Sequence, residues 1–113
     1  MRQICLIFIV LFSVNCQSQN LVVNPSFELI DSCPWNQGQI YLAIGWNTTF
    51  PSSLQATSDL YTPCNISMGT PFNFAGFQYP KSGNNYAGEI CYTSAAVNRR
   101  EYIEGSLMQQ LIS

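Results

Sequence analysis

Turn-forming residues interrupt this sequence so often that a long helix has no room to form. All six prolines and all seven glycines lie after residue 19, together with many Asn and Ser residues. None of the pieces between them keeps apolar residues at the three-to-four spacing of an amphipathic helix. The chain must therefore build its core from short extended segments joined by turns.

Six of the pieces read as β-strands. They are residues 21–23, 26–29, 39–46, 75–79, 85–93 and 100–111. Alternation is clear in 85–93, where Tyr86 and Ile90 share one side and Cys91 lies on the other. Such alternation between turn-rich spacers predicts an all-β antiparallel sandwich or barrel. Residues 47–74, which hold three prolines, are predicted to form a long loop.

The first pieces suggest how the domain begins. Residues 21–23 are expected to form an edge strand, and Pro25 interrupts its ladder because proline has no N–H group. Phe27 then restarts a strand and is expected to point into the core.

Residues 1–19 have the build of a secretory signal peptide. Arg2 precedes an unbroken apolar run over residues 4–12, and Ser18 supplies a small residue before the expected cut. The run is too short for a bilayer, which needs roughly 20 residues, so no membrane span is expected in the mature chain. The domain is therefore assigned to residues 20–113, secreted or at the cell surface.

A lipoprotein is the alternative, with Cys16 as the lipidated residue. That signal requires a small residue where Asn15 stands, so the cleaved, secreted form is favoured. Three cysteines remain after cleavage, and an oxidising environment favours one bridge and one odd thiol.

Charge and composition exclude several function classes. Removal of Arg2 with the leader takes the formal net charge from −2 to −3, with no basic patch to neutralise phosphates, so no nucleic-acid partner is predicted. The chain has no histidine, which removes a histidine general base and a histidine metal ligand. Glu101 and Glu104 lie three apart on a predicted strand and should face opposite sides as solvated carboxylates. We therefore predict neither catalysis nor a cofactor.

An ordered series of short motifs carries a resemblance. It begins with Asn-Leu-Val-Val-Asn-Pro-Ser-Phe-Glu and continues through Ser-Cys-Pro, Gly-Trp, Tyr-Ala-Gly and Arg-Glu-Tyr-Ile. Over residues 20–107 the chain resembles a module of secreted and surface proteins of Gram-negative bacteria that use type IX secretion. One departure is that Ser58-Asp59-Leu60-Tyr61 stands where the family has Pro-Asp-Tyr-Phe.

The resemblance implies a galactose-binding-like jelly roll, the sandwich of many carbohydrate-binding modules. Such modules often precede an OmpA-like peptidoglycan-binding domain or a sorting domain, so further domains of a longer parent protein are expected. Family members continue with several more strands beyond Arg-Glu-Tyr-Ile. Residues 20–113 are therefore expected to be an incomplete sandwich.

The resemblance also bears on the cysteines. Cys33 and Cys64 lie in proline-containing loops, and the family places half-cysteines at both positions, which predicts a bridge between them. Cys91 lies among apolar residues of a predicted strand and is expected to be a buried free thiol.

Candidate ligand contacts lie beside the first half-cysteine. Trp35 follows Cys33-Pro34 in a polar loop, and an exposed loop aromatic would suit a sugar ring, although the sequence leaves its exposure open. Asn36, Gln37 and Tyr61 are the predicted supporting contacts. Trp46 follows an apolar run and is predicted to be structural.

Two further points stay open. Glu28 and Asp31 could hold a structural calcium of the kind that many jelly-roll modules carry, although their spacing is not diagnostic and no metal site is assigned. The favoured function is non-catalytic binding of glycan or another cell-surface polymer. The alternative is a structural spacer or assembly module of an outer-membrane, OmpA-like or adhesin-like protein.

Export generates the first testable prediction. N-terminal sequencing of the exported protein should begin at Gln19 or Asn20, because the expected cut follows Ser18. An extracellular protein that keeps Met1 would contradict the prediction.

Overall fold

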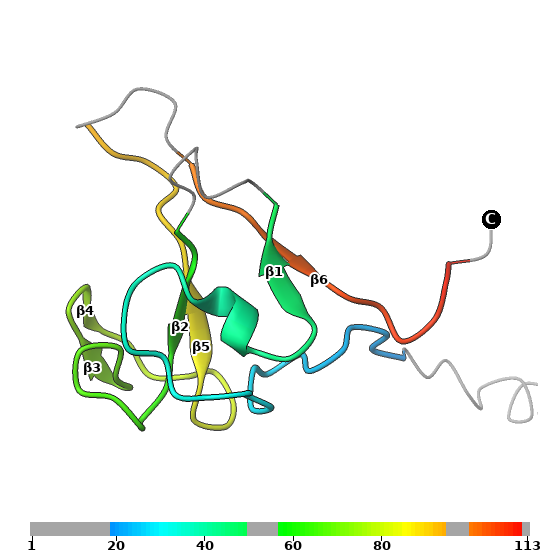
Figure 1. Ribbon diagram of the computed structural model, residues 1–113, viewed down its shortest axis with the longest axis horizontal. Coiled ribbons are helices and arrows are strands. Elements are labelled where there is room, and N and C mark those ends of the chain that lie inside the picture. Colours follow the sequence, from blue (N-terminus) through cyan, green and yellow to red (C-terminus); the bar gives the residue numbers. More distant parts are fainter. Residues whose placement is uncertain (1–18, 50–56, 95–99, 112–113) are drawn as a thin grey trace, which may run out of the picture.

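The computed structural model describes residues 19–49, 57–94 and 100–111 (Figure 1). These residues form antiparallel β-strands and one 3₁₀ turn, and no α-helix occurs among them. The elements are η1 (Ile40–Leu42), β1 (Trp46–Thr48), β2 (Asp59–Tyr61), β3 (Phe72–Asn73), β4 (Gly76–Phe77), β5 (Tyr86–Gly88) and β6 (Ile103–Gly105). The all-β antiparallel class is confirmed, and the arrangement is compatible with a β-sandwich.

The strands form three antiparallel pairs. β1 pairs with β6, β2 with β5, and β3 with β4 (Figure 1). Only β3 and β4 form a local hairpin, whereas the other two pairs join segments far apart in the sequence. Single bridges add two more contacts, Val22 with Leu107 and Ile30 with Ala43.

The apolar run 39–46 was predicted to be a strand, and this prediction is wrong. Residues Ile40–Leu42 form a 3₁₀ turn, closed by the Ala43 N–H, which donates to the Ile40 carbonyl at 2.9 Å. The turn buries Ile40 and Leu42 while Tyr41 stays exposed. A short apolar run is compatible with either geometry, so periodicity alone could not separate them.

The predicted long loop 47–74 is also wrong, because it contains β2 and β3 and most of β1. All three residues of β2 are buried, and Leu60 at its centre has no exposed surface. A three-residue strand that is buried throughout shows no alternation, which hides it in the sequence. Other strands are shorter than predicted: 85–93 keeps only β5, and 100–111 keeps only β6.

The core is small and lies where η1 meets β2. Ile40, Leu42, Ala43 and Leu60 are its buried members. Partly buried apolar side chains pack around this cluster: Phe27, Ile30, Trp46, Ala87 and Ile103. The rings of Phe27 and Trp46 lie with centroids 4.5 Å apart, so Trp46 is part of the packing.

Asn24 organises the N-terminal turn. Its side-chain amide donates to the carbonyls of Leu29 at 2.9 Å and Ile44 at 3.1 Å, and its side-chain oxygen accepts from the Leu29 N–H at 3.0 Å. Its own carbonyl accepts from the Trp46 indole N–H at 2.8 Å. Asn24 has a φ of 50°, in the left-handed region that asparagine tolerates better than most residues.

The prediction of a strand at residues 26–29 is wrong, because this segment takes part in the same turn. Phe27 packs against the core as expected, but with a φ of 62°, inside a turn. Glu28 then accepts the backbone N–H groups of Asn84 and Asn85, both at 2.9 Å. Asn85 donates from its side chain to the Phe27 carbonyl at 2.8 Å. The start of the domain is thereby joined to the turn that precedes β5.

Replacing Asn24 should test how much the fold depends on this turn. Asn24→Ala removes three hydrogen bonds to backbone groups of Leu29 and Ile44, so we expect a loss of about 2–4 kcal/mol in unfolding free energy. Urea denaturation followed by tryptophan fluorescence measures this loss. Asn47→Ala is the matched control, because Asn47 is exposed and, among the described residues, its side chain bonds only the adjacent Thr48 N–H; it should cost less than about 0.5 kcal/mol. Equal losses in both variants would contradict the prediction.

Candidate functional site

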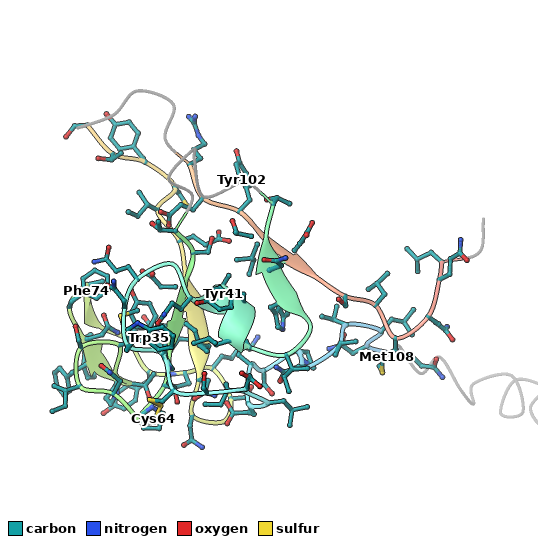
Figure 2. All side chains as sticks on the ribbon, in the orientation of Figure 1. Trp35, Tyr41, Cys64, Phe74, Tyr102 and Met108 are labelled. Atoms are coloured by element: carbon teal, nitrogen blue, oxygen red, sulfur yellow. A yellow bond between two sulfur atoms is a disulfide. The ribbon has the colours of Figure 1, made fainter. Side chains whose placement is uncertain are left out.

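The loop that carries Trp35 is held at several points. The predicted Cys33–Cys64 disulfide is present, with a Cα–Cα distance of 6.0 Å (Figure 2). The side-chain oxygen of buried Gln39 accepts the N–H groups of Trp35 at 2.8 Å and Asn36 at 2.9 Å. Trp35 is 65% exposed on this loop, so the structure presents an indole ring to solvent on a hydrogen-bonded backbone.

The free thiol differs from expectation. Cys91 is unpaired, as predicted, but exposed rather than buried. The physical reason is that β5 ends at Gly88, so the residues that follow lie outside a sheet.

A cavity of about 330 Å³ lies beside the loop. This volume is at the lower end of the range for small-molecule sites, roughly 300–1,000 Å³. It is lined by residues of the loop, β2, the β3–β4 hairpin and β5 with the residues after it. The lining residues are Gln37, Thr57, Asp59, Tyr61, Asn73, Phe74, Ala75, Gly76, Phe77, Gln78, Tyr86, Gly88, Glu89 and Ile90.

Asp59 is the buried acid of the cavity. Its carboxylate accepts the Gly38 N–H at 2.6 Å and the Tyr61 hydroxyl at 3.1 Å. Burial raises the pKa of Asp59, against the lowering effect of these two hydrogen bonds. Burial and the neighbouring Asp59 charge also raise the pKa of Tyr61. The Gly38 contact ties the Trp35 loop to β2.

Glu101 corrects the prediction of two solvated carboxylates. Glu104 is exposed, but Glu101 is only 3% exposed. Glu101 accepts the Thr57 hydroxyl at 2.6 Å and the Ile90 N–H at 2.8 Å. Backbone and hydroxyl donors from distant segments satisfy the buried charge, and sequence spacing gives no sign of them.

Aromatic rings form much of the cavity wall. The Tyr61 ring centroid lies 5.0 Å from that of Tyr86 and 6.1 Å from that of Phe74. Asn73 donates from its side chain to the Tyr86 hydroxyl at 2.6 Å. A Cβ at Gly88 would meet the Tyr61 ring, so the glycine makes room for that ring.

Most aromatic residues around this region are exposed to solvent. Only Tyr61 is buried, at 4% exposed. The others are exposed: Phe72, Phe74, Phe77 and Tyr79. They lie on or beside the β3–β4 hairpin, whose strands have two residues each and are too small to cover them.

The structure divides the four nominated contact residues into two groups. Gln37 and Tyr61 line the cavity, although Tyr61 offers its ring while its hydroxyl is bonded to Asp59. Trp35 and Asn36 lie on the same loop, both exposed, and outside the set of described residues that line the cavity.

Sequence reasoning missed the polar lining of the cavity, above all Asp59 and Glu89. The only available signal was that Asp59 adjoins the apolar pair Leu60-Tyr61, which suggests a short buried strand.

Metal binding receives no support from the residues that the structure describes. No group of three or more Cys, Asp or Glu side chains there could hold an ion. Glu28, a candidate calcium ligand, instead accepts two backbone N–H groups, and Asp31 is exposed. In the same described residues, no helix is long and apolar enough to cross a membrane.

Comparisons with known proteins add no identification. No protein-family model matches the chain, and neither curated proteins nor solved structures gave a match.

The raised pKa of Asp59 generates a prediction with a definite sign. A folded pKa above the unfolded value means that the folded state binds the proton more tightly. The contribution of Asp59 to stability should therefore fall as pH rises from the ordinary carboxyl pKa of 3.8 through the raised pKa. Asp59→Asn keeps an oxygen for the Gly38 N–H and should lose this pH dependence. Urea unfolding of both proteins over a pH series tests it; parallel pH curves would contradict it.

Proposed function

We propose that this chain is a secreted or cell-surface, non-catalytic β-sandwich module that binds glycan or another cell-surface polymer. The observation that carries the proposal is the exposed Trp35 ring on a hydrogen-bonded loop, beside a cavity that Gln37 of the same loop lines. Sugar rings present C–H faces to aromatic surfaces and hydroxyl groups to amides. Trp35, Asn36 and Gln37 supply both kinds of group on three consecutive residues.

The rigidity of the loop favours binding. The disulfide joins residues 31 apart in sequence, which in the chain-entropy model stabilises the fold by about 3–4 kcal/mol. Together with the Gln39 and Gly38 hydrogen bonds, it holds the loop backbone before a ligand arrives. A ligand would then lose little affinity to ordering of the loop.

The proposal also extends to the fold family and to the parent protein. We infer a galactose-binding-like jelly roll of the kind attached to type IX secretion proteins, forming part of a longer parent protein. The motif resemblance supports this, as do the antiparallel β-pairs and the disulfide, which suits an oxidising compartment.

Two tryptophan substitutions should separate binding from folding. Trp35→Ala should leave the melting temperature nearly unchanged and weaken retention on a polysaccharide affinity gel, because the exposed ring makes few internal contacts. Trp46→Ala should lower the unfolding free energy by about 3–5 kcal/mol, since Trp46 packs on Phe27 and bonds Asn24.

Tyr92→Ala is the matched control for retention. Tyr92 is an aromatic residue that is 79% exposed and lies outside the loop and the cavity lining. Its loss should leave retention unchanged. Retention that Trp35→Ala does not alter would remove the nominated site. Failure to bind any tested glycan would favour the structural spacer.

A further inference from the structure

The cavity has an electrostatic character that binding of a neutral glycan does not require. Asp59 and Glu89 line it, and no Lys or Arg is among the described residues that do so. A third carboxylate, Glu101, adjoins it, because Glu101 bonds the lining residues Thr57 and Ile90. Among the described residues, the lining therefore holds the carboxylates of Asp59 and Glu89 and no Lys or Arg side chain.

The aromatic rings that line the cavity also favour a positively charged ligand. The cavity is lined by Tyr61, Tyr86, Phe74 and Phe77, and the Tyr61 ring centroid lies 5.0 Å from that of Tyr86 and 6.1 Å from that of Phe74. The face of an aromatic ring carries partial negative charge and attracts a cation within about 6 Å of its centroid. Carboxylates and ring faces thus favour the same ligand charge.

Other ligand charges suit this cavity less well. A carboxylate or phosphate ligand would meet Asp59 and Glu89 without a basic lining residue to balance its charge. A neutral ligand would bury the aromatic wall but would gain nothing from the charge of the exposed Glu89. A cation is attracted by the carboxylates and by the aromatic ring faces. The cavity volume of about 330 Å³ limits the bound cation to a small group.

We propose that this cavity binds a small organic cation, an amine or quaternary ammonium group, either free or as a substituent of a larger glycan. The inference goes beyond glycan binding at Trp35 and does not depend on it. The cation lies against the rings of Phe74 and Tyr61, and Glu89 supplies the exposed counter-charge.

Isothermal titration calorimetry on the full chain provides the test. Choline and 3,3-dimethyl-1-butanol have nearly the same shape, but only choline is charged. Choline should bind at least about 10-fold more tightly than the neutral alcohol, since cation–π attraction and the carboxylates act only on the charged compound. Comparison of glucosamine with N-acetylglucosamine tests the same dependence on charge for a sugar, because only glucosamine carries a free amine. Binding of choline, glucosamine or both supports the proposal and identifies the source of the cation.

Paired variants locate the site. Phe74→Leu keeps apolar volume but removes a ring, and should weaken cation binding by about 3- to 30-fold. Tyr92→Leu changes an exposed aromatic residue that does not line the cavity, and should leave binding unchanged. Glu89→Gln should also weaken binding, while Glu104→Gln, at an exposed carboxylate on β6, should not.

Clear results would overturn the proposal. They are equal affinity for choline and its neutral isostere together with equal affinity for the two sugars, no measurable binding of either cation, or equal effects of Phe74→Leu and Tyr92→Leu. Circular dichroism of each variant ensures that only folded proteins are compared. Trp35→Ala reports on glycan retention separately, so failure of one proposal is distinguishable from failure of the other.

Discussion

The side-chain amide of Asn24 is the interaction on which the arrangement of the first half of the domain depends. It satisfies backbone groups of Leu29 and Ile44, while the Asn24 carbonyl holds the indole of Trp46. A turn that begins with Asn-Pro cannot satisfy its groups through a β-ladder, so the side chain takes over that role. Gly45 completes the fit: a Cβ there would lie 2.8 Å from a methyl group of Val23.

Carboxylates also accept backbone hydrogen bonds between distant segments: Asp59 and Glu101 are buried, and Glu28 is half-buried. Glu28 accepts N–H groups before β5, Asp59 accepts the Gly38 N–H, and Glu101 accepts donors from Thr57 and Ile90. Among the described residues, the main apolar cluster has four buried members, and strands of two or three residues provide few ladder hydrogen bonds. Side chains that accept backbone hydrogen bonds therefore replace much of the order that longer strands would provide.

Some features of the fold could be predicted from the sequence, and others depend on short segments or on partners far along the chain. The all-β class was predictable because turn residues punctuate the whole chain, and the disulfide was predictable from the resemblance. The 3₁₀ turn at Ile40–Leu42 and the buried strand Asp59–Tyr61 were not, because segments of three residues are too short to display a period. Burial of Glu101 was equally hidden, since its partners lie 44 and 11 residues away. At the site, the sequence indicated the Trp35 loop and Tyr61 but not the acidic lining around them.

The pairing of distant strands also sets an order of events as the chain is synthesised from its N-terminus. β2 cannot meet β5 until Gly88 is available, and β1 cannot meet β6 until Gly105 is. The contacts of Asn24 with Ile44 and Trp46 span about twenty residues and can form first. Contacts between remote segments carry a larger loop-closure entropy and slow folding. Until β6 is available, β1 therefore has no strand partner within the described part of the chain, whereas the β2–β5 pair can already have formed.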